Sequence, residues 1–329
     1  MGNPVPAVRA QRGRTVNVQL LTLLGILAVF CVVYAFATPS FLYWDNISDL
    51  IRQGAFVIIT GAGVTLLMIS GNIDLSVGSI VALSSCVFAF AGKAGIPTPV
   101  AAILGALTGM GIGGINALTV VKLRVTPFIA TLGTMYAVRG FTYIITDART
   151  VRNGLPADIS FLDTAHAGPV PLAFFILLAV VVLFYSLEKK SLLGKYSFAI
   201  GGNRTAAILS GINADAIVAR LYIIVGLLAG LSGVMIGSRL AVGEPNVGIG
   251  FEFDVIIAVI LGGTALAGGE GSILGMVIGA FIVEVIGNGL NKLNVLSFWQ
   301  SIIKGVLLVL AVLLNQSLVR ARKRTRLTS

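Results

Sequence analysis

Three charged side chains interrupt long apolar stretches of this sequence. Glu284 lies in the middle of residues 273–290, Arg139 lies within 127–146, and Lys304 lies within 298–318. Ionisable side chains at membrane depth are costly, so they pair with one another or take part in moving ions and protons. Two interpretations follow. Glu284 forms a helix-bridging ion pair with Arg139 or Lys304, or it is the proton or cation site of an ion-coupled secondary transporter.

A second polar group lies at residues 71–79, with the sequence GNIDLSVGS. Asn72, Asp74 and Ser76 stand there at the boundary between two apolar runs. One interpretation is a broken helix whose polar groups face a water-filled passage, because irregular backbone at membrane depth is tolerated where it lines a cavity. The other is a turn in which Asp74 caps the following helix. Both can hold at once.

Motifs of catalysis and of cofactor binding are absent from the sequence. It contains no GxxxxGK[ST] phosphate loop, and it also lacks GxSxG, HExxH and paired CxxC motifs. Its two cysteines, Cys31 and Cys86, lie in apolar runs, and its one histidine, His166, has no second His or Cys at ligand spacing. We therefore expect no catalytic residue, no metal site and no cofactor bound by this chain, and we do not expect it to be an enzyme.

The composition determines which elements can position these residues. Of the 329 residues, 57% are hydrophobic and 11% are charged. So much apolar surface cannot be buried in one water-soluble core, and a lipid bilayer must be its solvent. We expect an all-α polytopic membrane protein in which residues 1–329 form a single transmembrane domain.

The net charge of +10 is concentrated in short patches that flank apolar runs. An excess of Lys and Arg marks the cytoplasmic side of a membrane protein. We therefore expect both termini inside, with residues 1–17 as a cytoplasmic segment and 319–329 as a cytoplasmic basic tail. This placement favours a role in topology over nucleic-acid binding. Fourteen of the 23 basic residues form four patches: Arg9, Arg12 and Arg14; Lys122 and Arg124; Lys189, Lys190, Lys195 and Arg204; and Arg320, Arg322, Lys323, Arg324 and Arg326.

Apolar runs of about 20 residues can cross a membrane as helices, and by this measure the sequence predicts ten spans. A mixture of aromatic and charged residues at 39–53 is typical of the outer membrane interface. Residues 147–169 and 241–252 are expected as outer loops. The ten spans are 18–38, 54–70, 76–91, 98–121, 127–146, 170–187, 217–240, 253–267, 273–290 and 298–318.

Short matches indicate an internal repeat. GGINAL at 113–118 resembles NGLNKL at 288–293, and Asp74 before the third span corresponds to Asp254 at the eighth. The matches pair spans three to five with spans eight to ten, in order. A shift of five spans inverts the second copy, which is the inverted-repeat arrangement of many transporters.

Residues 188–215 form the longest cation-rich polar interval of the chain. Gly202 predicts a turn there, and Asn203 is placed to cap a short helix. Small residues at 205–207, followed by Gly211, would give that helix a smooth face that fits a cleft on a partner. An ordinary solvated connector is the alternative.

Three motifs resemble those of the permeases of ribose-type ABC sugar importers, and they occur in the same order over nearly the whole chain. They are residues 71–79, GGNRTAA at 201–207 with SGI at 210–212, and ILGGTALAGGEGS at 260–272. The candidate residues of the translocation pathway are Asn72, Asp74, Ser76, Gly262, Gly263, Gly268 and Gly269.

The resemblance implies a permease subunit of an ABC importer in the bacterial inner membrane. Its substrate would be a monosaccharide, either a pentose or a hexose, or a related polyol, delivered by a periplasmic sugar-binding protein. Two permease subunits, identical or similar, would form the pathway. A cytoplasmic ATPase that binds ATP and magnesium would drive transport. No motif of this chain identifies the sugar.

The resemblance also assigns a docking loop. ABC importers carry the pattern Glu-Ala-Ala, three residues and Gly where the ATPase docks, and residues 206, 207 and 211 match it. Thr205 stands in place of the Glu. We therefore expect the contact with the ATPase to be formed by Gly202, Asn203, Thr205, Ala206, Ala207 and Gly211.

Overall fold

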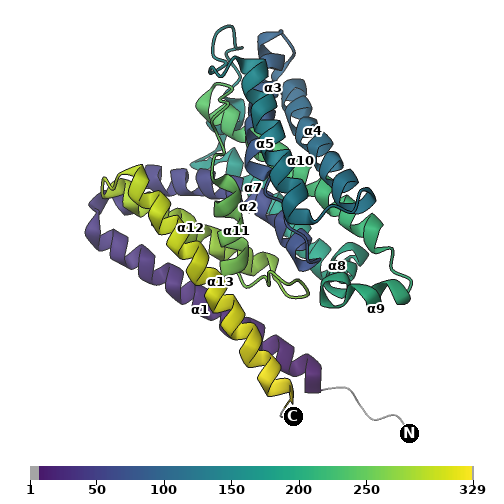
Figure 1. The fold of residues 1–329 in the computed structure, drawn as a ribbon. Helices are drawn as coiled ribbons and strands as arrows, with labels where there is room; N and C mark the ends of the chain where they lie inside the picture. The colour runs from purple at the N-terminus through teal and green to yellow at the C-terminus, as the bar shows by residue number, and fades with distance from the viewer. Residues whose placement is uncertain (1–6, 328–329) are drawn as a thin grey trace.

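The computed structural model describes the backbone of residues 7–327 and the side chains of residues 20–313. The basic side chains of the first and last patches lie outside the described side chains. The described chain is built from helices and one two-stranded hairpin (Figure 1). Its helices are α1 (Ala7–Ala37), α2 (Trp44–Ile69), α3 (Val77–Lys93), α4 (Thr98–Ala117), α5 (Pro127–Thr146), α6 (Phe161–Thr164), α7 (Leu172–Lys190), α8 (Leu192–Gly202), α9 (Arg204–Leu209), α10 (Ala214–Leu240), α11 (Phe251–Leu261), α12 (Ile273–Lys292) and α13 (Ser297–Leu327), and its strands are β1 (His166–Ala167) and β2 (Val170–Pro171).

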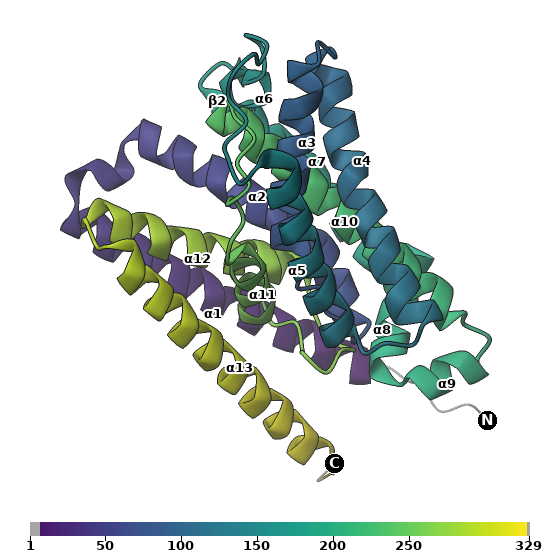
Figure 2. The same cartoon turned by 45° about the horizontal axis from the view of Figure 1, so that its top comes forward.

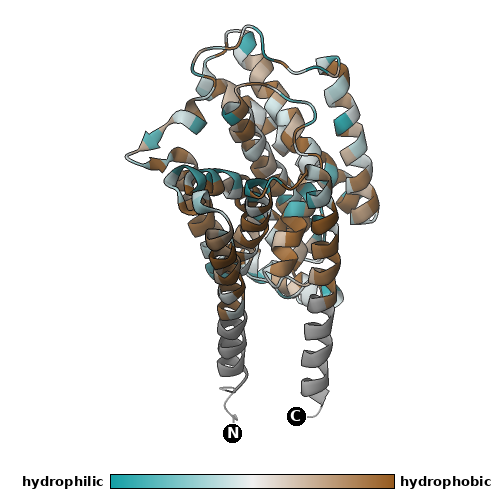
Figure 3. Ribbon diagram, turned by 90° about the vertical axis from the view of Figure 1, so that its left-hand side faces the viewer, coloured by the Kyte–Doolittle hydropathy of each residue, from teal (hydrophilic) through white to brown (hydrophobic). Residues whose placement is uncertain are grey.

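Within the described residues, seven helices are long and apolar enough to cross a membrane. They are α2, α5, α7, α10, α12, the part of α1 at Leu20–Ala37, and α4 together with the π-helical turn Leu118–Lys122 that follows it. Two further apolar helices are shorter, namely α3 and the part of α13 at Ser297–Leu313. These nine coincide with nine of the ten predicted spans, which confirms an all-α polytopic membrane protein. Figure 3 shows apolar residues along these helices and hydrophilic ones in the connections at one end.

The eighth predicted span, residues 253–267, is wrong in length. Helix α11 has 11 residues and ends at Leu261, so it measures about 16 Å, whereas the apolar core of a bilayer is about 30 Å thick. Gly263, with φ of +93°, lies just beyond its last turn, where a left-handed residue stops a helix. Figure 2 shows α11 in the middle of the bundle. The remaining residues of this apolar run form a non-helical segment instead of a second half of the span, with Gly262, Thr264 and Ala265 buried and Leu266 and Ala267 exposed.

The segment before α11 is not only an outer loop, as the sequence suggested. Gly243 lies against Cys86 and Ala89 of α3, and Gly248 lies against Gly78 near the start of the same helix. The segment therefore runs along α3 from near one end to the other before α11 begins. A Cβ on Gly78 would overlap the carbonyl oxygen of Gly248, so glycine makes this close approach possible.

Residues 39–53 also differ from the prediction of an interfacial segment. A short 3-10 helix at Pro39–Leu42 leads directly into α2, which begins at Trp44. The second span therefore starts ten residues earlier than predicted. Of the acidic residues in its first turns, Asp49 pairs with Arg239 of α10 at 3.2 Å, whereas Asp45 is exposed.

The predicted outer loop at 147–169 contains local structure. Helix α6 and the β1–β2 hairpin lie within or next to it, and the pairing of Ala167 with Val170 shortens the sixth predicted span, which begins at Leu172 as α7. We call the end of the bundle that carries this hairpin the hairpin end.

Close packing of the central helices depends on glycine. Helix α10 packs against α4, α3 and α2. Cβ atoms on Gly109, Gly226 or Gly230 would overlap the backbone of the facing helix. Small residues allow membrane helices to approach this closely, which agrees with the large number of glycines in the sequence.

The packing order parallels the predicted repeat. α3 contacts both α4 and α5, and α11 contacts both α12 and α13. In each half the third helix packs more on the first than on the second. The inverted repeat itself stays a prediction.

Candidate functional site

The polar interval 188–215 folds into two short helices, α8 and α9, at one end of the bundle (Figure 1). We call this the α8–α9 end. Asn203 caps α9, because its Oδ1 accepts a hydrogen bond from the N–H of Ala206 at 2.9 Å. Gly211 follows the helix with φ of +83°. The predicted turn, cap and glycine stop are therefore confirmed.

Helix α9 presents an apolar surface that the sequence interpretation missed. Ile208 is 52% exposed and Leu209 is 83% exposed. Thr205 and Ala206 are exposed as well, whereas Ala207 is 5% exposed and faces the membrane body. The sequence signal for the missed residues was two adjacent aliphatic side chains within a polar interval.

The three sequence motifs meet at this end of the bundle. A Cβ on Gly201 of α8 would overlap the carbonyl oxygen of Ile69, the last residue of α2. The N–H of Gly269 donates to that same oxygen at 2.8 Å. A Cβ on Gly268 would lie 2.9 Å from backbone atoms of Gly71 and 3.0 Å from Gly201. Residues 71–79, 201–212 and 260–272 are therefore joined through backbone contacts.

Helix α7, which leads into α8, is fixed to α12 at its carboxyl end. Glu188, whose side chain is fully buried, accepts a hydrogen bond from the N–H of Ile273 at 2.9 Å. Ile273 is the first residue of α12, so the carboxylate lies at the positive end of the helix dipole. Lys189 lies 2.7 Å from the same carboxylate. The start of the coupling interval is thereby held to the start of a transmembrane helix.

A second attachment joins α9 to the connection between α4 and α5. Asp215 lies 2.7 Å from Arg204 of α9 and 2.7 Å from Arg124, which contacts both of its carboxylate oxygens. Arg124 has φ of +59° and lies just after the π-helical turn. One carboxylate of α10 therefore connects two segments that are separate in the sequence.

The polar turn at residues 71–76 is packed into the protein interior. Asp74 is fully buried, and its Oδ1 accepts hydrogen bonds from the N–H and the hydroxyl of Ser76 at 2.8 and 2.6 Å. Asn116 of α4 donates to the other carboxylate oxygen at 3.1 Å, and Tyr222 of α10 donates to the carbonyl of Ile73 at 3.0 Å. Asn116 and Tyr222 are fully buried residues that the sequence interpretation did not assign.

Asp74 thus stabilises a turn before α3, as the second interpretation predicted, but it does not cap the helix, because the N-cap is Ser76 and no side chain makes a capping hydrogen bond. Asn72 is buried and donates to the carbonyl oxygen and the hydroxyl of Ser70. Gly262 packs against the backbone of Gly275 in α12. The assignment of these residues and of Gly268 and Gly269 to a translocation pathway stays a prediction. Gly268 and Gly269 contact α8, whereas Asp74 contacts α4 and Gly262 contacts α12.

The predicted ion pair of Glu284 with Arg139 or Lys304 is wrong. Lys304 pairs with Asp254 of α11 at 2.7 Å. Arg139 donates to the carbonyl oxygens of Pro245 and Val247, both at 2.8 Å, and so holds the segment that precedes α11. In the described residues neither cation lies within ion-pair distance of Glu284. The sequence placed all three charges within predicted spans, but it did not identify Asp254 as the partner of Lys304. No group of three His, Cys, Asp or Glu residues suited to a metal ion occurs in the same part of the chain.

The structure is a polytopic helix bundle with the α8–α9 pair rigidly attached at one end. It has no catalytic constellation among its described side chains, and this form is that of a membrane transport subunit. Comparison with known proteins agrees with this class. The family described as "Branched-chain amino acid transport system / permease component" matches residues 46–312. The chain belongs to this family of permeases.

Individual relatives give the same result. The chain is 40% identical over 294 residues to the ribose import permease protein of Bacillus subtilis, covering 88% of this chain and 90% of the relative. It is 37% identical over 294 residues to the D-allose transport system permease protein of Escherichia coli, with coverage of 88% and 90%. It is 32% identical over 319 residues to the L-arabinose ABC transporter permease protein of Azospirillum brasilense, with coverage of 95% and 93%. No solved structure matches this chain.

Proposed function

We propose that this chain is the permease subunit of an ABC importer that carries a monosaccharide or a related polyol across the bacterial inner membrane. The names of three relatives assign them ribose, D-allose and L-arabinose, which supports a sugar as the substrate class. A second permease subunit, a periplasmic sugar-binding protein and a cytoplasmic ATPase, which holds the ATP and magnesium, complete the importer. The termini and the α8–α9 end face the cytoplasm.

The observation that carries this proposal is the combination of an exposed apolar helix with a rigid attachment. Ile208 and Leu209 form an apolar surface of α9 outside the membrane body. Gly201, by contrast, contacts the backbone of Ile69, the last residue of α2. Apolar anchors on a short helix suit a groove on a partner protein. The ATPase would therefore bind α9, and its movement would reach α2 through α8 and α12 through the end of α7.

The energetic requirement explains why the attachment is rigid. Moving a two-state equilibrium from 1:99 to 99:1 takes about 5.5 kcal/mol. A flexible tether would not transmit this free energy from the ATPase to the spans, because its two ends move independently. Backbone contacts at Gly201 hold α8 to α2, and Gly194 packs α8 on the end of α7, where the buried Glu188 carboxylate binds α12. These contacts leave α8 little freedom. The α8–α9 pair therefore fits the role of a lever between the ATPase and the spans.

Docking can be tested with Leu209→Arg. The change places a charge on the exposed apolar surface of α9, so we expect it to abolish copurification with the cognate ATPase and ATP-driven sugar uptake in proteoliposomes. The matched control is Leu192→Arg, because Leu192 is 62% exposed on the neighbouring helix α8. We expect this control to retain copurification and uptake. If Leu209→Arg keeps both, the docking role of α9 is refuted.

An ion-coupled transporter based on Glu284 is the second candidate function. Neither predicted cation lies within ion-pair distance of this carboxylate, and for that reason the alternative is tested separately. We expect Glu284→Gln to retain ATP-driven uptake and an ionophore to leave uptake unchanged. Uptake that needs an ion gradient, proceeds without an ATPase and is lost in Glu284→Gln would refute the ABC importer.

A further inference from the structure

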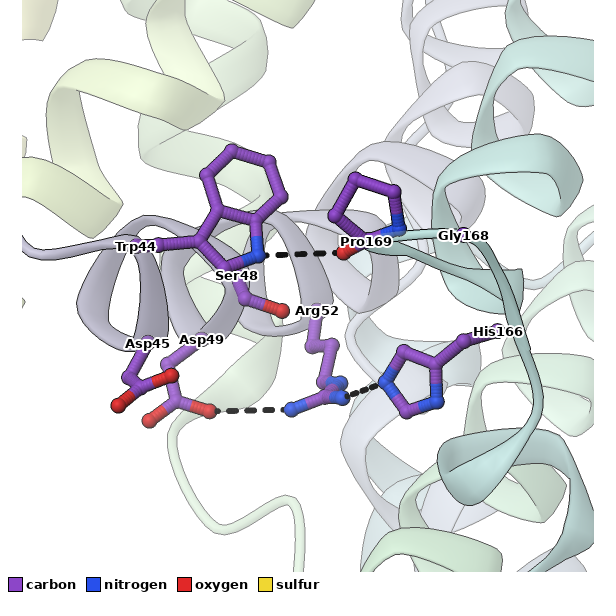
Figure 4. Close-up of a pocket in the computed structure, with 8 residues that line it drawn as sticks. All are labelled: Trp44, Asp45, Ser48, Asp49, Arg52, His166, Gly168 and Pro169. Atoms are coloured by element: carbon purple, nitrogen blue, oxygen red, sulfur yellow. Dashed lines mark hydrogen bonds and ion pairs between the residues drawn. The ribbon is translucent and has the colours of Figure 1, made fainter.

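A cavity of about 360 Å³ lies at the hairpin end. It falls at the lower end of the range for small-molecule sites, roughly 300–1,000 Å³. One wall is the first part of α2 and the other is the β1–β2 hairpin with its connecting turn (Figure 4). From Arg52, the last α2 residue that lines this cavity, the helix runs 17 residues to Ile69 at the contact with α8, a distance of about 26 Å.

The wall formed by α2 follows from its sequence spacing. Trp44, Ser48 and Arg52 are four residues apart, and Asp45 and Asp49 repeat the same spacing one position further on. Residues four apart lie on one face of a helix. The aromatic, hydroxyl, acidic and guanidinium groups therefore gather on a single strip of α2, which lines the cavity.

Two contacts hold the hairpin against this strip. The indole Nε1 of Trp44 donates to the carbonyl of Pro169 at 3.2 Å, and Nη2 of Arg52 lies 2.7 Å from Nε2 of His166. Trp44 remains 48% exposed although its N–H is engaged. Its ring face is thus available beside the polar side chains, as Figure 4 shows.

The polar groups that line the cavity have hydrogen-bonding capacity that the protein itself does not satisfy. Asp45 is exposed and has no hydrogen-bond or ion-pair partner among the described residues. Asp49 lies 3.5 Å from Arg52 and 3.2 Å from Arg239, while Nε of Arg52 is buried, makes no hydrogen bond and lies 3.5 Å from Asp163. Carboxylates only accept hydrogen bonds and guanidinium groups only donate them. A molecule with neighbouring hydroxyl groups can serve both, because each hydroxyl donates and accepts.

We propose that this cavity is a binding site for a small, neutral, polyhydroxylated molecule, a sugar or polyol, on the outer side of the membrane. The excess of carboxylates over guanidinium groups in its lining disfavours phosphorylated ligands, and its polar strip disfavours apolar ones. A sugar ring can lie on the exposed face of Trp44 while its hydroxyls meet Asp45 and Asp49. The proposal rests on the proposed import function and adds a first site on the permease itself.

The experiment uses Trp44 as its own reporter. The chain has two tryptophans, so Trp299→Phe leaves Trp44 as the single indole in the full-length protein. This variant, in lipid nanodiscs, is titrated with D-ribose, D-allose, L-arabinose and, as a contrasting probe, L-leucine. We expect a saturable change of fluorescence with at least one sugar and none with L-leucine. A response to L-leucine alone, or to none of the four, overturns the proposal.

Variants then locate the binding. In the Trp299→Phe background, Asp49→Asn and Asp45→Asn should each weaken sugar binding about tenfold, as expected when a hydrogen bond to a charged group is lost. If Asp49→Asn disturbs the fold, Asp45→Asn alone tests sugar binding, because Asp45 has no ion-pair or hydrogen-bond partner among the described residues whose loss could destabilise the protein. The matched control is Asp158→Asn, a carboxylate of the same outer connection that does not line the cavity. Equal sugar affinity in all three variants overturns the proposal.

Failure of this proposal is distinguishable from failure of the import function. If the ATPase copurifies and drives uptake while sugars leave Trp44 unaffected, the cavity proposal is refuted and the import function stands. If Trp44 responds to the purified binding protein but to no free sugar, the cavity is a protein-docking surface and the proposal is also refuted. If no ATPase-driven uptake occurs, the import function itself fails.

Discussion

At its carboxyl end α2 meets α8 through backbone atoms, whereas at its amino end it lines a cavity with side chains. The carbonyl oxygen of Ile69 accepts a hydrogen bond from Gly269 and packs against Gly201, with no side chain between them. Asp45 and Trp44 instead line the cavity with exposed side chains. Under the proposed function, the first arrangement would transmit displacement because it contains no rotatable side chain. The second can accept a ligand because its groups are only partly engaged.

The difference predicts opposite responses to mutation. At the α8–α9 end the smallest added atom must disturb the contact between helices, and at the hairpin end a side chain can change with little effect on stability. The comparison fails if the two ends respond alike. Three variants of decreasing expected effect test it.

The largest effect is expected from Gly201→Ala. The added Cβ would overlap the carbonyl oxygen of Ile69, and backbone cannot move aside as a side chain tip can. Overpacking of this kind typically costs about 1–3 kcal/mol. We expect a lower midpoint of thermal unfolding and loss of ATP-driven uptake. The matched control for stability is Gly202→Ala, because nothing lies within 4 Å of a Cβ at that position. Equal unfolding midpoints for the two variants would contradict the rigid attachment of α8.

An intermediate effect is expected from Asp215→Asn. The change removes the charge that Arg204 and Arg124 share. Because all three side chains are partly exposed, the loss of stability should stay within about 1 kcal/mol. Uptake should nevertheless fall about two- to tenfold, since movement of α9 no longer reaches the connection before α5. Uptake per hydrolysed ATP in proteoliposomes measures this loss of coupling.

Two further variants serve as controls for the Asp215→Asn result. Asp158→Asn removes a carboxylate at the hairpin end and should leave uptake per ATP unchanged. The double change Arg204→Asp with Asp215→Arg restores one of the two ion pairs and should recover part of the coupling. Wild-type coupling in Asp215→Asn would show that Arg124 and Arg204 act independently of each other.

Features that depend on neighbouring residues along the chain were predictable from the sequence. Apolar runs of sufficient length gave nine of the spans, because helix formation in lipid satisfies all backbone hydrogen bonds locally. The cap at Asn203 and the stop at Gly211 were predictable for the same reason, since each depends on only a few residues.

Features decided by distant contacts were not predictable. The course of the segment before α11 depends on the approach of Gly248 to Gly78, which are 170 positions apart in the sequence. The partner of Lys304 depends on how α11 and α13 rotate against each other, and Asp254 and Glu284 were equally acceptable by type. The cavity required the hairpin to fold back on α2, although the four-residue spacing of its α2 wall was already visible.

The smallest effect is expected from Trp44→Phe at the hairpin end. The change removes one partly exposed hydrogen bond, from Nε1 to the carbonyl of Pro169 at 3.2 Å, while an aromatic ring remains on the strip. A neutral hydrogen bond contributes about 0.5–1.5 kcal/mol, so amide hydrogen exchange in the hairpin should become roughly 2- to 10-fold faster. Global unfolding should stay close to wild type, because the hairpin contributes little to the buried core.

Mass spectrometry of hydrogen exchange in a peptide that covers residues 164–172 measures this effect. Trp299→Phe is the matched control, since Trp299 is 60% exposed and its indole makes no hydrogen bond among the described residues. Unchanged exchange in both variants would mean that Arg52 and His166 alone hold the hairpin. A global loss of stability as large as that of Gly201→Ala would mean that the hairpin end is as tightly integrated as the α8–α9 end, and the distinction between a transmitting and a receiving end of α2 would be lost.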